Sequence, residues 1–426
     1  VRAPGPHEHG GGAATGSNGL VGVLLVIAVV LVLGIAACVL LRRRGAPGGR
    51  LPAVTRVLVA GLAGVTLTVW LTSGARSLPL AAEEPPEPGV PLLRSLALPG
   101  DRHLSVLVVP NRPGYNLVGI AGAAQASAGI DRGRLKRGSR RPGSALTWVG
   151  VELPAGSSRL WVSAAQGTGS LPVDTGEGPP ASPAALRGGD GPECAAAAAG
   201  AIVAGGSRPL TGCPADALAP RDAASLRSVV RFIAGRGERT LMLAGDDSPR
   251  GRAAAATVRA AAREEGVAVT PPAGTGHPLM VVAGWKRAQA LVDDVAHGRL
   301  KAQGTYLAPW LMTRPLLSPN ARQLIPLRYA PRTAAPMAYV AALNERIPGE
   351  YPSTAGYSAW RDVRDRTGPG AVRLYAVALT YIPGQNFGPT AGDEAGGHSH
   401  GPDAVGWVPG AMIAEVARPL TGGGPA

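Results

Sequence analysis

The chain of 426 residues has few aromatic residues, few cysteines and few lysines. Aromatic residues make up 4% of the sequence, and there are only three cysteines and three lysines, although the chain has 42 basic residues. RNA-binding modules stack bases on aromatic side chains that lie beside basic ones. No basic stretch of this chain is interleaved with aromatic residues in that way. We therefore expect no nucleic-acid partner, although the formal net charge is +14.

Signatures of several enzyme classes are missing as well. The sequence has no His-Glu-x-x-His motif for a catalytic metal, no Gly-Lys-Ser/Thr of a P-loop and no Cys-x-x-Cys. The Asp293–Asp294 pair falls within a helical pattern among charged neighbours, which is typical of a solvated surface. The sequence gives no positive signal for catalysis, and we expect a protein that is not an enzyme.

The positive net charge has two interpretations. One is a basic surface that meets anionic headgroups or wall polymers. The other is an arginine-rich composition that is spread over the surface without a common partner. The sequence alone leaves both open.

Two apolar runs near the start of the chain are separated by an arginine-rich linker. The first run, residues 20–41, has no charged residue and is followed by three arginines; the second spans residues 57–71. About 20 apolar residues cross a hydrocarbon core, and short arginine-rich loops stay on the cytoplasmic side. The sequence predicts a transmembrane hairpin over residues 19–75, with most of the chain extracytoplasmic. A late signal peptide is the alternative for the first run.

The three cysteines divide into one and two. Cys38 lies in the first apolar run, which leaves Cys194 and Cys213 as a pair in the part predicted to be exported. Because disulfides persist in oxidising compartments, we predict a disulfide between Cys194 and Cys213. A loop of this length contributes about 3 kcal/mol in the chain-entropy model. The alternative is two unpaired buried thiols.

Composition and turn signals divide the chain into seven segments. The first is Gly-rich and polar, as disordered segments are, and the acidic, Pro-rich third segment is typical of an extended spacer. The predicted segments are a disordered N-terminal segment (1–18), the hairpin (19–75), the spacer (76–100), a β-sandwich (101–166), a linker (167–190), an α/β domain (191–385) and a Gly/His-rich C-terminal segment (386–426).

Residues 104–164 alternate short β-rich runs with turn signals. The first two runs flank the turn cluster Pro110–Gly114, a basic Gly-rich loop follows at 131–143, and two more runs lie at 145–153 and 158–164. Strands at such spacing are typical of a small antiparallel β-sandwich. The segment VVPNRPGYNLV resembles the strand–turn–strand of the immunoglobulin-like domains of copper-resistance membrane proteins, in which a Pro-Gly-x-Asn turn joins the strands.

Helical and strand patterns alternate later in the chain, which implies βαβ units and a parallel sheet. An Ala-rich helix is expected at 194–203. The next predicted helices are 223–234, 249–265, 285–295, 336–346 and 353–365. The predicted strands are 240–244, 267–269, 279–283, 305–312 and 371–382, with a short strand pair within 405–416.

The order of these pieces resembles that of the type I periplasmic binding proteins, the branched-chain amino-acid receptor group, over about residues 185–370. The strand TLMLA is followed by DDSPRG at a helix start, and the strand LMVVAG runs directly into a helix. The segment YVAALNERIPGEYPSTAGYSAWRDV resembles the closing helix pair of the family. The resemblance implies two α/β lobes that close on a solute. Only about 30 residues stand where most of the first lobe belongs, so we predict a reduced version of that fold.

Ligands of open α/β sheets bind outside the carboxyl ends of the strands. That rule points to Asp246, Asp247 and Ser248 after one strand, and to Trp285 after another, as ligand-binding residues. Each has a structural alternative. Asp246 and Ser248 suit the cap of the following helix, and Trp285 suits an anchor that packs the start of a helix on the sheet.

Two histidine pairs lie near the ends of the chain. His7 and His9 flank a glutamate, and His398 and His400 flank a serine in a Gly-rich context. Imidazole nitrogens bind Cu²⁺, Ni²⁺ and Zn²⁺, so these four residues are the candidate metal ligands and copper is the candidate cofactor. The alternative is a low-complexity surface without metal.

The predicted fold class is therefore multi-domain: a two-helix transmembrane hairpin, a small antiparallel β-sandwich and a reduced α/β domain like that of the periplasmic binding proteins. The first functional hypothesis is a membrane-anchored, extracytoplasmic, non-catalytic protein that binds or senses a small solute. One alternative is an extracytoplasmic copper-handling protein that uses its histidines. The other is a protein-interaction scaffold with degenerate lobes, which a closed, side-chain-filled groove near Asp246 would favour.

Overall fold

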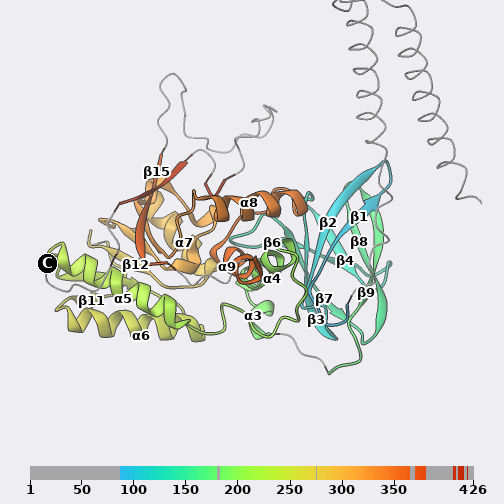
Figure 1. Ribbon diagram of the computed structural model, residues 1–426, viewed down its shortest axis with the longest axis horizontal. Helices are drawn as coiled ribbons and strands as arrows, with labels where there is room; N and C mark the ends of the chain where they lie inside the picture. Colours follow the sequence, from blue (N-terminus) through green and yellow to red (C-terminus); the bar gives the residue numbers. More distant parts are fainter. Residues whose placement is uncertain are drawn as a thin grey trace, which may run out of the picture. The chain divides into compact units, whose positions relative to one another are not determined.

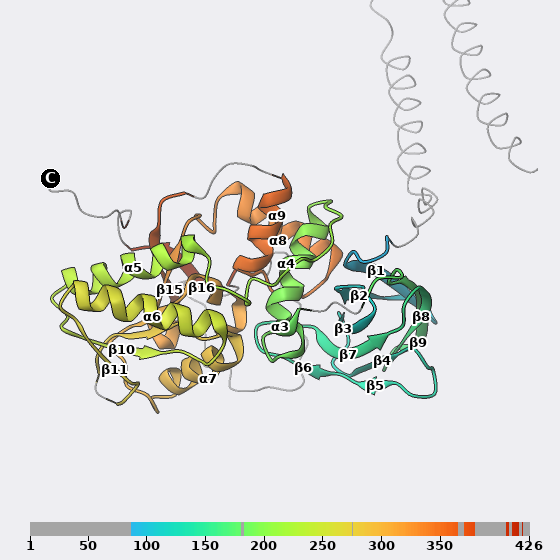
Figure 2. The same cartoon turned by 90° about the horizontal axis from the view of Figure 1, so that it is seen from below.

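A computed structural model describes residues 87–179, 183–274, 276–364, 370–379, 406–408, 411–416 and 420. All of them belong to the second of two compact units into which the chain divides, residues 85–426. This unit contains two antiparallel sheets, followed along the chain by one largely parallel sheet with helices on both faces (Figures 1 and 2).

The two antiparallel sheets form a β-sandwich. One sheet has the strand order β1-β2-β3-β7-β6, and the other has the order β5-β4-β8-β9. Their inward-facing apolar residues form one buried cluster, as the alternating pattern predicts. The strands are β1 (Leu92–Leu98), β2 (Arg102–Val109), β3 (Gly114–Ile120), β4 (Ala126–Gly129), β5 (Lys136–Arg137), β6 (Ser139–Arg140), β7 (Thr147–Leu153), β8 (Ser157–Ala164) and β9 (Gly167–Asp174).

The turn between β2 and β3 is fixed by one side chain. The Oδ1 atom of Asn116 accepts a hydrogen bond from the backbone N–H of Asn111 at 2.7 Å, and its Nδ2 atom donates to the carbonyl of Arg112 at 2.7 Å. Asn111 adopts a positive φ of 63°, which asparagine tolerates better than most residues. The amide of Asn116 therefore does what backbone hydrogen bonds do in a tighter hairpin.

The parallel sheet has the strand order β11-β10-β12-β13-β14, and two antiparallel strands, β15 and β16, extend it. This is the doubly wound order 2-1-3-4-5, in which the switch point lies between the first and third strands, here β10 and β12. The strands are β10 (Thr240–Ala244), β11 (Ala268–Thr270), β12 (Leu279–Val281), β13 (Thr305–Leu307), β14 (Gln323–Leu327), β15 (Arg373–Leu379) and β16 (Ala411–Glu415).

Helices cover both faces of this sheet. Figures 1 and 2 show α5 (Pro220–Gly235) and α6 (Pro249–Glu264) side by side on one face, with α7 (Trp285–Ala296) on the other. The buried residues of α5 include Leu226, Val229, Val230 and Ile233, the stripe that the sequence places on one helix face.

The remaining helices join the sheet to the sandwich. They are α3 (Ala184–Arg187), α4 (Gly191–Val203), α8 (Ala334–Arg346) and α9 (Thr354–Arg364). Helices α4 and α9 cross so closely that a Cβ atom on Gly200 would lie 2.0 Å from the carbonyl oxygen of Gly356. Only glycine fits at this crossing. One continuous buried cluster runs from sandwich residues such as Leu107 and Trp148 through α4 to the parallel sheet.

The structure corrects the predicted fold class on the transmembrane hairpin. Within the described residues, no helix combines the length and the apolar character needed to span a membrane. The longest described helices, α5 and α6, have 16 residues. At 1.5 Å per residue they reach about 24 Å, short of a hydrocarbon core of about 30 Å. The segment 19–75, to which the hairpin was assigned, lies outside the described residues, as does the N-terminal segment 1–18.

Two segments predicted to be irregular contain strands. Strand β1 lies within the predicted spacer, and β9 lies within the predicted linker. The sequence of β9, GTGSLPVD, has a weak pattern because only Leu171 and Val173 are buried. Its pairing with β8 and its place at a sheet edge, where Pro172 is tolerated, form this strand.

The predicted strand at 305–312 is also too long. Strand β13 ends at Leu307, and the 3₁₀-helix η1 (Pro309–Leu311) follows. Pro309 has no N–H to continue a ladder of hydrogen bonds, which explains the change. Strand β14 lies where the sequence pattern predicts no strand. Of the strand pair expected within 405–416, the described residues contain the single strand β16, which pairs with β15.

Candidate functional site

The switch point of the sheet brings together the residues that follow β10 and β12. Asp246 and Ser248 follow β10, and Gly284 and Trp285 follow β12. The Oδ2 atom of Asp246 accepts a hydrogen bond from the backbone N–H of Gly284 at 2.6 Å. The two predicted loops therefore do meet, but they are bonded directly to each other.

The second oxygen of Asp246 is occupied as well. Its Oδ1 atom accepts hydrogen bonds from the hydroxyl of Ser248 at 2.6 Å and from the backbone N–H of Ser248 at 3.1 Å. The hydroxyl oxygen of Ser248 in turn accepts from the N–H of Gly251 at 2.9 Å, as an N-cap does. Asp247 is exposed, and the described contact of this residue is made by its backbone carbonyl, to Arg252. Ser248 therefore caps α6, and Asp246 joins this cap to the loop after β12.

The N-terminus of α7, at the switch point, already holds an anion from the chain itself. The Oδ1 atom of Asp190, just before α4, accepts a hydrogen bond from the backbone N–H of Lys286 at 2.9 Å. A Cβ atom on Gly284 would lie 2.2 Å from Oδ2 of the same carboxylate. Helix N-termini attract anions, and here the carboxylate of Asp190 occupies that position at α7.

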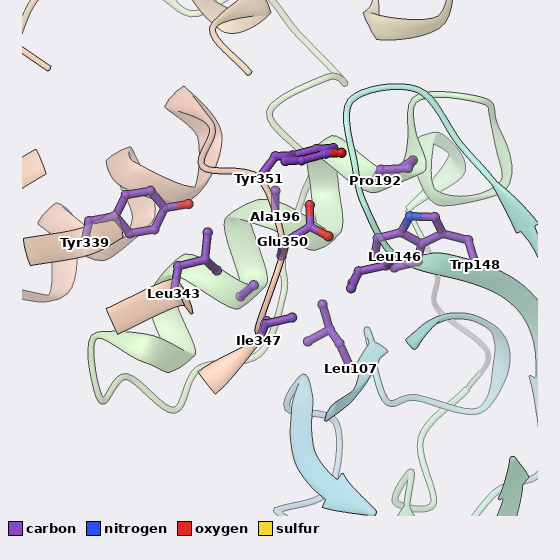
Figure 3. Close-up of a pocket in the computed structure, with 11 residues that line it drawn as sticks. Leu107, Leu146, Trp148, Pro192, Ala196, Tyr339, Leu343, Ile347, Glu350 and Tyr351 are labelled. Carbon is purple, nitrogen blue, oxygen red and sulfur yellow. The ribbon is translucent and has the colours of Figure 1, made fainter. Parts of the chain in front are cut away.

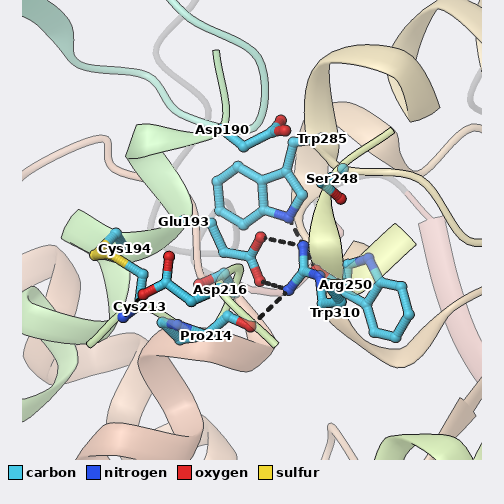
Figure 4. A network of polar contacts seen from close by, with 12 residues as sticks. Asp190, Glu193, Cys194, Cys213, Pro214, Asp216, Ser248, Arg250, Trp285 and Trp310 are labelled. Carbon is cyan, nitrogen blue, oxygen red and sulfur yellow. Dashed lines mark hydrogen bonds and ion pairs between the residues drawn. A yellow bond between two sulfur atoms is a disulfide. The ribbon is translucent and has the colours of Figure 1, made fainter. Parts of the chain in front are cut away.

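A buried ion pair lies beside this carboxylate (Figure 4). The two terminal nitrogens of Arg250, at the start of α6, donate to the two carboxylate oxygens of Glu193, in α4, at 2.6 Å each. The exposed fractions of the two side chains are 4% and 0%. Burial opposes the charge of Arg250, but the adjacent carboxylate raises the pKa of the guanidinium. Burial raises the pKa of Glu193, against the attraction of Arg250. The pair therefore holds α4 against the start of α6.

Two tryptophans fill the rest of the space. The indole N–H of Trp285 donates to the carbonyl of Trp310 at 2.9 Å, and the indole N–H of Trp310 donates to the carbonyl of Ala283 at 2.9 Å. The guanidinium of Arg250 lies 4.5 Å from the centre of the Trp310 ring. Trp285 is therefore a buried anchor. We call the group of residues at the switch point the closed site; they are Asp190, Glu193, Asp246, Arg250, Trp285 and Trp310.

The sandwich closes the site from the other side. Gly143, at φ +79°, lies so close to Trp285 that a Cβ atom would be 1.9 Å from the ring. Its carbonyl accepts a hydrogen bond from the hydroxyl of Thr313 at 2.9 Å. A loop of the sandwich thus packs directly on Trp285, and residues 170–222 build no α/β lobe in the described part of the chain.

A cavity on the sandwich side of α4 is too small for a solute (Figure 3). The centre of a water molecule can move within only about 10 Å³ of it, which is room for one water at most. Its polar wall is Glu350, whose carboxylate accepts a hydrogen bond from the hydroxyl of Ser144 at 2.9 Å. Burial raises the pKa of Glu350 to about 7, against the hydrogen bond from Ser144.

A larger cleft lies between the sandwich loop and α7. Its volume is about 550 Å³, and its wall includes the cations Arg140, Arg141 and Lys286 together with Asp293 and Tyr351. Arg141 is partly engaged, because it donates to the carbonyl of Gly188 at 2.9 Å. This cleft is next to the switch point but is not the position where strand carboxyl ends bind ligands.

The predicted disulfide between Cys194 and Cys213 is present, with the two Cα atoms 4.9 Å apart. It ties the segment after α4 back to the helix that carries Glu193. The backbone N–H of Cys213 donates to the carboxylate of Asp216 at 2.7 Å, which orders the same segment. The disulfide therefore supports the ion pair of the closed site.

The candidate metal ligands His7, His9, His398 and His400 lie outside the described residues. Among the residues that are described, no group of three His, Cys, Asp or Glu side chains is placed to hold a metal ion. Copper binding at the four histidines stays a prediction, which a Cu²⁺ titration before and after replacement of His398 and His400 by alanine would test.

Several residues of the closed site were missed at the level of sequence, namely Asp190, Glu193, Arg250 and Trp310. One of them carries a usable signal. Glu193 stands at the start of the Ala-rich run ECAAAAAG, where a charged residue is unexpected unless it is paired. The sequence gives no indication that the partner is Arg250, because the two residues are 57 positions apart.

No protein-family model matches this sequence, and no curated protein matches it. Solved structures that are similar over part of the chain are solute-binding proteins of ABC transporters. The protein of Desulfitobacterium hafniense with bound Leu is 13% identical, at a TM-score of 0.25, over 33% of this chain and 47% of that chain. The protein of Rhodopseudomonas palustris with 3,4-dihydroxybenzoic acid is 13% identical, at a TM-score of 0.31, over 37% and 61%.

A third structure, a branched-chain amino-acid ABC transporter protein of Thermus thermophilus with bound valine, is 14% identical, at a TM-score of 0.25, over 36% of this chain and 61% of that chain. The chain thus spans about half to three-fifths of the length of these structures.

Proposed function

We propose that the described part of the chain is a non-catalytic protein-interaction scaffold whose solute position is closed by its own residues. The observation that carries this proposal is the direct bonding of the switch point. Asp246 bonds Gly284, and Asp190 bonds Lys286, at the place where a solute would bind. A receptor that closes on a solute needs this place to be free.

Opening the site has a high energetic cost. A solute would have to replace the hydrogen bonds that Gly284 and Lys286 donate to carboxylates, and bonds to charged groups are worth about 1.5–3 kcal/mol each. Moving α4 aside would also break the pair of Arg250 and Glu193, and separating a buried pair costs about 3–5 kcal/mol. The closed form is therefore more stable than a complex with any solute whose contacts are of ordinary strength.

The surface that we assign to a partner is the basic loop, residues 131–141. Its cations are Arg132, Arg134, Lys136, Arg137, Arg140 and Arg141, and its one carboxylate is Asp131. All of these except Arg141 are exposed, and Arg132 lies 5.2 Å from the centre of the Trp161 ring. A net charge of +5 on eleven residues favours a partner protein with an acidic surface.

The closure can be tested with the solutes bound by the similar structures. Trp285 and Trp310 lie at the switch point, so their fluorescence reports any solute that enters. We expect leucine, valine, benzoate and 3,4-dihydroxybenzoate to leave both the fluorescence and the melting temperature unchanged. A saturable change in both, lost in the Asp246→Ala variant, would show an open solute site and overturn the proposal.

The partner surface can be tested with an oligoglutamate peptide as the acidic probe. Replacement of Arg132, Arg134, Lys136 and Arg137 by glutamine removes four exposed cations, at about 0.5 kcal/mol each, so we expect about thirtyfold weaker binding. The matched control replaces four exposed arginines of α5, α6 and α7, namely Arg227, Arg259, Arg263 and Arg287. Equal loss in both variants would mean that net charge alone, and not the basic loop, holds the probe.

The disulfide supports a location in an oxidising compartment outside the cytoplasm, which is part of the proposal. Structural disulfides are rare where thiols are kept reduced. Thiol trapping in intact cells tests this location, because Cys194 and Cys213 should resist alkylation until a reductant is added. Free thiols at both positions in freshly quenched cells would contradict it.

The 550 Å³ cleft favours a second candidate function, the binding of a small anionic solute. Its volume lies in the range of ligand pockets, and Arg140 and Lys286 line it. Under this alternative, an aromatic carboxylate such as benzoate would raise the melting temperature, and the Arg140→Gln/Lys286→Gln variant would abolish the rise while Asp246→Ala would not. The unchanged melting temperature expected above would exclude it.

A further inference from the structure

We propose that a cavity at the carboxyl end of β14 is a binding site for a small oxyanion of the phosphate or sulfate class. The cavity lies where α5 and α9 begin, and its lining also includes the end of β14 and Pro309 of η1. It is two strands away from β12 in the sheet, and none of its lining residues belongs to the closed switch point. It therefore does not depend on the scaffold function.

Cations and hydroxyl groups dominate its polar wall. The cations are Arg221 at the start of α5, Arg328 after β14 and Arg361 in α9. The hydroxyl-bearing residues are Ser225, Thr354, Ser358 and Tyr329. The first turns of two helices, α5 and α9, contribute Arg221, Asp222 and Thr354 to the wall. Such a combination of donors is what an oxyanion needs and what a neutral or cationic ligand does not use.

The strongest evidence is a set of buried donors that lack acceptors. The side chain of Arg361 is only 12% exposed, and its nearest carboxylate among the described residues, Asp362, is 4.0 Å away. In the part of the chain that the structure describes, its Nε–H has no hydrogen-bond partner, and neither has the Nε–H of Arg328. Buried charged donors are rarely left unpaired, because the missing bond costs free energy. An anion in the cavity would bring negative charge to both guanidinium groups.

The hydrogen bonds that Arg328 does make hold its side chain in place but do not neutralise its charge. Its terminal nitrogens donate to the carbonyls of Gly370 at 3.2 Å and Arg221 at 3.4 Å. Both are backbone oxygens, so the charge of the guanidinium is not neutralised by them. The hydroxyls of Tyr329 and Thr354 are hydrogen-bonded to each other at 2.9 Å, which leaves Ser358 as a hydroxyl donor for the anion.

The charge balance allows an anion of two negative charges. Three arginines and one carboxylate, Asp222, line the cavity, which leaves an excess of two positive charges. Burial raises the pKa of Asp222, against the attraction of Arg221. A divalent oxyanion would neutralise the remainder.

The size of the cavity selects a small ligand. The volume open to the centres of water molecules is about 30 Å³. One water needs about 10–15 Å³ by the same measure. Two or three such centres hold the oxygens that would face Arg328 and Arg361, and the other oxygens of a tetrahedral anion would lie at the mouth of the cavity beside the exposed Arg221. The body of an amino acid or a nucleotide has no room. The chemical class is therefore the free oxyanion, and phosphate and sulfate are the two sources to separate.

Calorimetric titration of the full chain with sodium phosphate and with sodium sulfate tests the proposal, in a buffer without other oxyanions and with sodium chloride matched for ionic strength. We expect saturable binding of one anion per chain for phosphate, sulfate or both, and none for chloride. The ratio of the two affinities shows which oxyanion the site prefers. No saturable binding of either, or binding of chloride with the same affinity, would show that the cavity is no oxyanion site and would overturn the proposal.

Two variants place the site. Arg361→Gln should weaken binding about tenfold or more, because it removes a charge-assisted pair of hydrogen bonds, and Ser358→Ala should weaken it less. Arg364→Gln, one turn along the same helix and exposed, is the matched control and should bind like the wild type. If Arg361→Gln does not fold, the affinities of Ser358→Ala and Arg364→Gln for the anion are compared instead, and only that of Ser358→Ala should be lower than the affinity of the wild type. Equal affinity of Ser358→Ala, Arg364→Gln and the wild type would place the anion elsewhere and refute the assignment.

Discussion

Replacement of Arg250 by methionine removes one half of the buried ion pair and leaves Glu193 without its partner. Methionine keeps most of the volume beside Trp310 and introduces no new charge. The carboxylate of Glu193 has an exposed fraction of 0%, so it must either stay charged in an apolar site or take up a proton. The stability of the variant should therefore depend on pH.

The size of the effect follows from proton uptake. The ordinary pKa of the glutamate side chain is 4.5, and keeping it protonated above that pH costs about 1.4 kcal/mol per pH unit. This amounts to about 0.7 kcal/mol at pH 5 and about 3.4 kcal/mol at pH 7. Loss of the hydrogen bond to Pro214 and of the contact with Trp310 adds about 1 kcal/mol. We expect a loss of about 2 kcal/mol at pH 5 and of about 4 kcal/mol at pH 7.

The sign follows from linkage. In the variant, burial raises the pKa of Glu193 in the folded state above its value in the unfolded state. The folded state then binds a proton that the unfolded state has released, so stability falls as pH rises above 4.5. The pH dependence of the difference between variant and wild type isolates this group from all others that titrate in both proteins.

Urea unfolding followed by far-ultraviolet circular dichroism at the two pH values measures these differences. The double variant Glu193→Met/Arg250→Met should be pH-independent and close to the wild type in stability, because apolar replacements of a buried pair are often neutral or stabilising. Arg259→Met, at an exposed position of α6, is the control and should change stability by less than about 0.5 kcal/mol. If Arg250→Met lost the same free energy at both pH values, Glu193 would be hydrated and the closed site as described would be wrong.

Three other perturbations test the packing around the site. Between pH 4.5 and about 7, wild-type unfolding free energy should fall relative to Glu350→Gln, by up to about 1.4 kcal/mol per pH unit, because burial raises the pKa of Glu350; urea midpoints at several pH values measure this. Gly200→Ala should cost at least about 2 kcal/mol, since its Cβ would meet the backbone of Gly356, and a wild-type melting temperature would show that the crossing can relax. Cys213→Ser should lower the unfolding free energy by about 3 kcal/mol, and addition of a reductant to the wild type should give the same loss.

Local patterns predicted the α/β half well. The run TLMLA lies in the structure as β10, and Ser248 caps α6 with its side chain as the Asp-Asp-Ser-Pro sequence indicates. The apolar stripe of α5 faces the core at the positions expected from helix spacing. These features depend on residues that are neighbours in the chain, and periodicity and capping rules address such neighbours directly.

The closed site was beyond prediction for the opposite reason. Glu193 and Arg250 are 57 positions apart, and Gly143 meets the hydroxyl of Thr313 across 170 positions. No periodicity relates such residues, and only the fold brings them together. Strand β9 shows the same limit, because its pairing with β8 supplies what its own sequence lacks.

The central claim is that the chain itself occupies the switch point, and hydrogen exchange at two amides tests it most directly. Gly284 donates to Asp246, and Lys286 donates to Asp190. If the site is closed, these two amides should exchange as slowly as the amides of β12, the strand that precedes them in the chain. Leucine, valine or benzoate should not change their exchange rates. Fast exchange at both, with protection that appears only when a solute is added, would mean that the site opens and that the protein is a receptor.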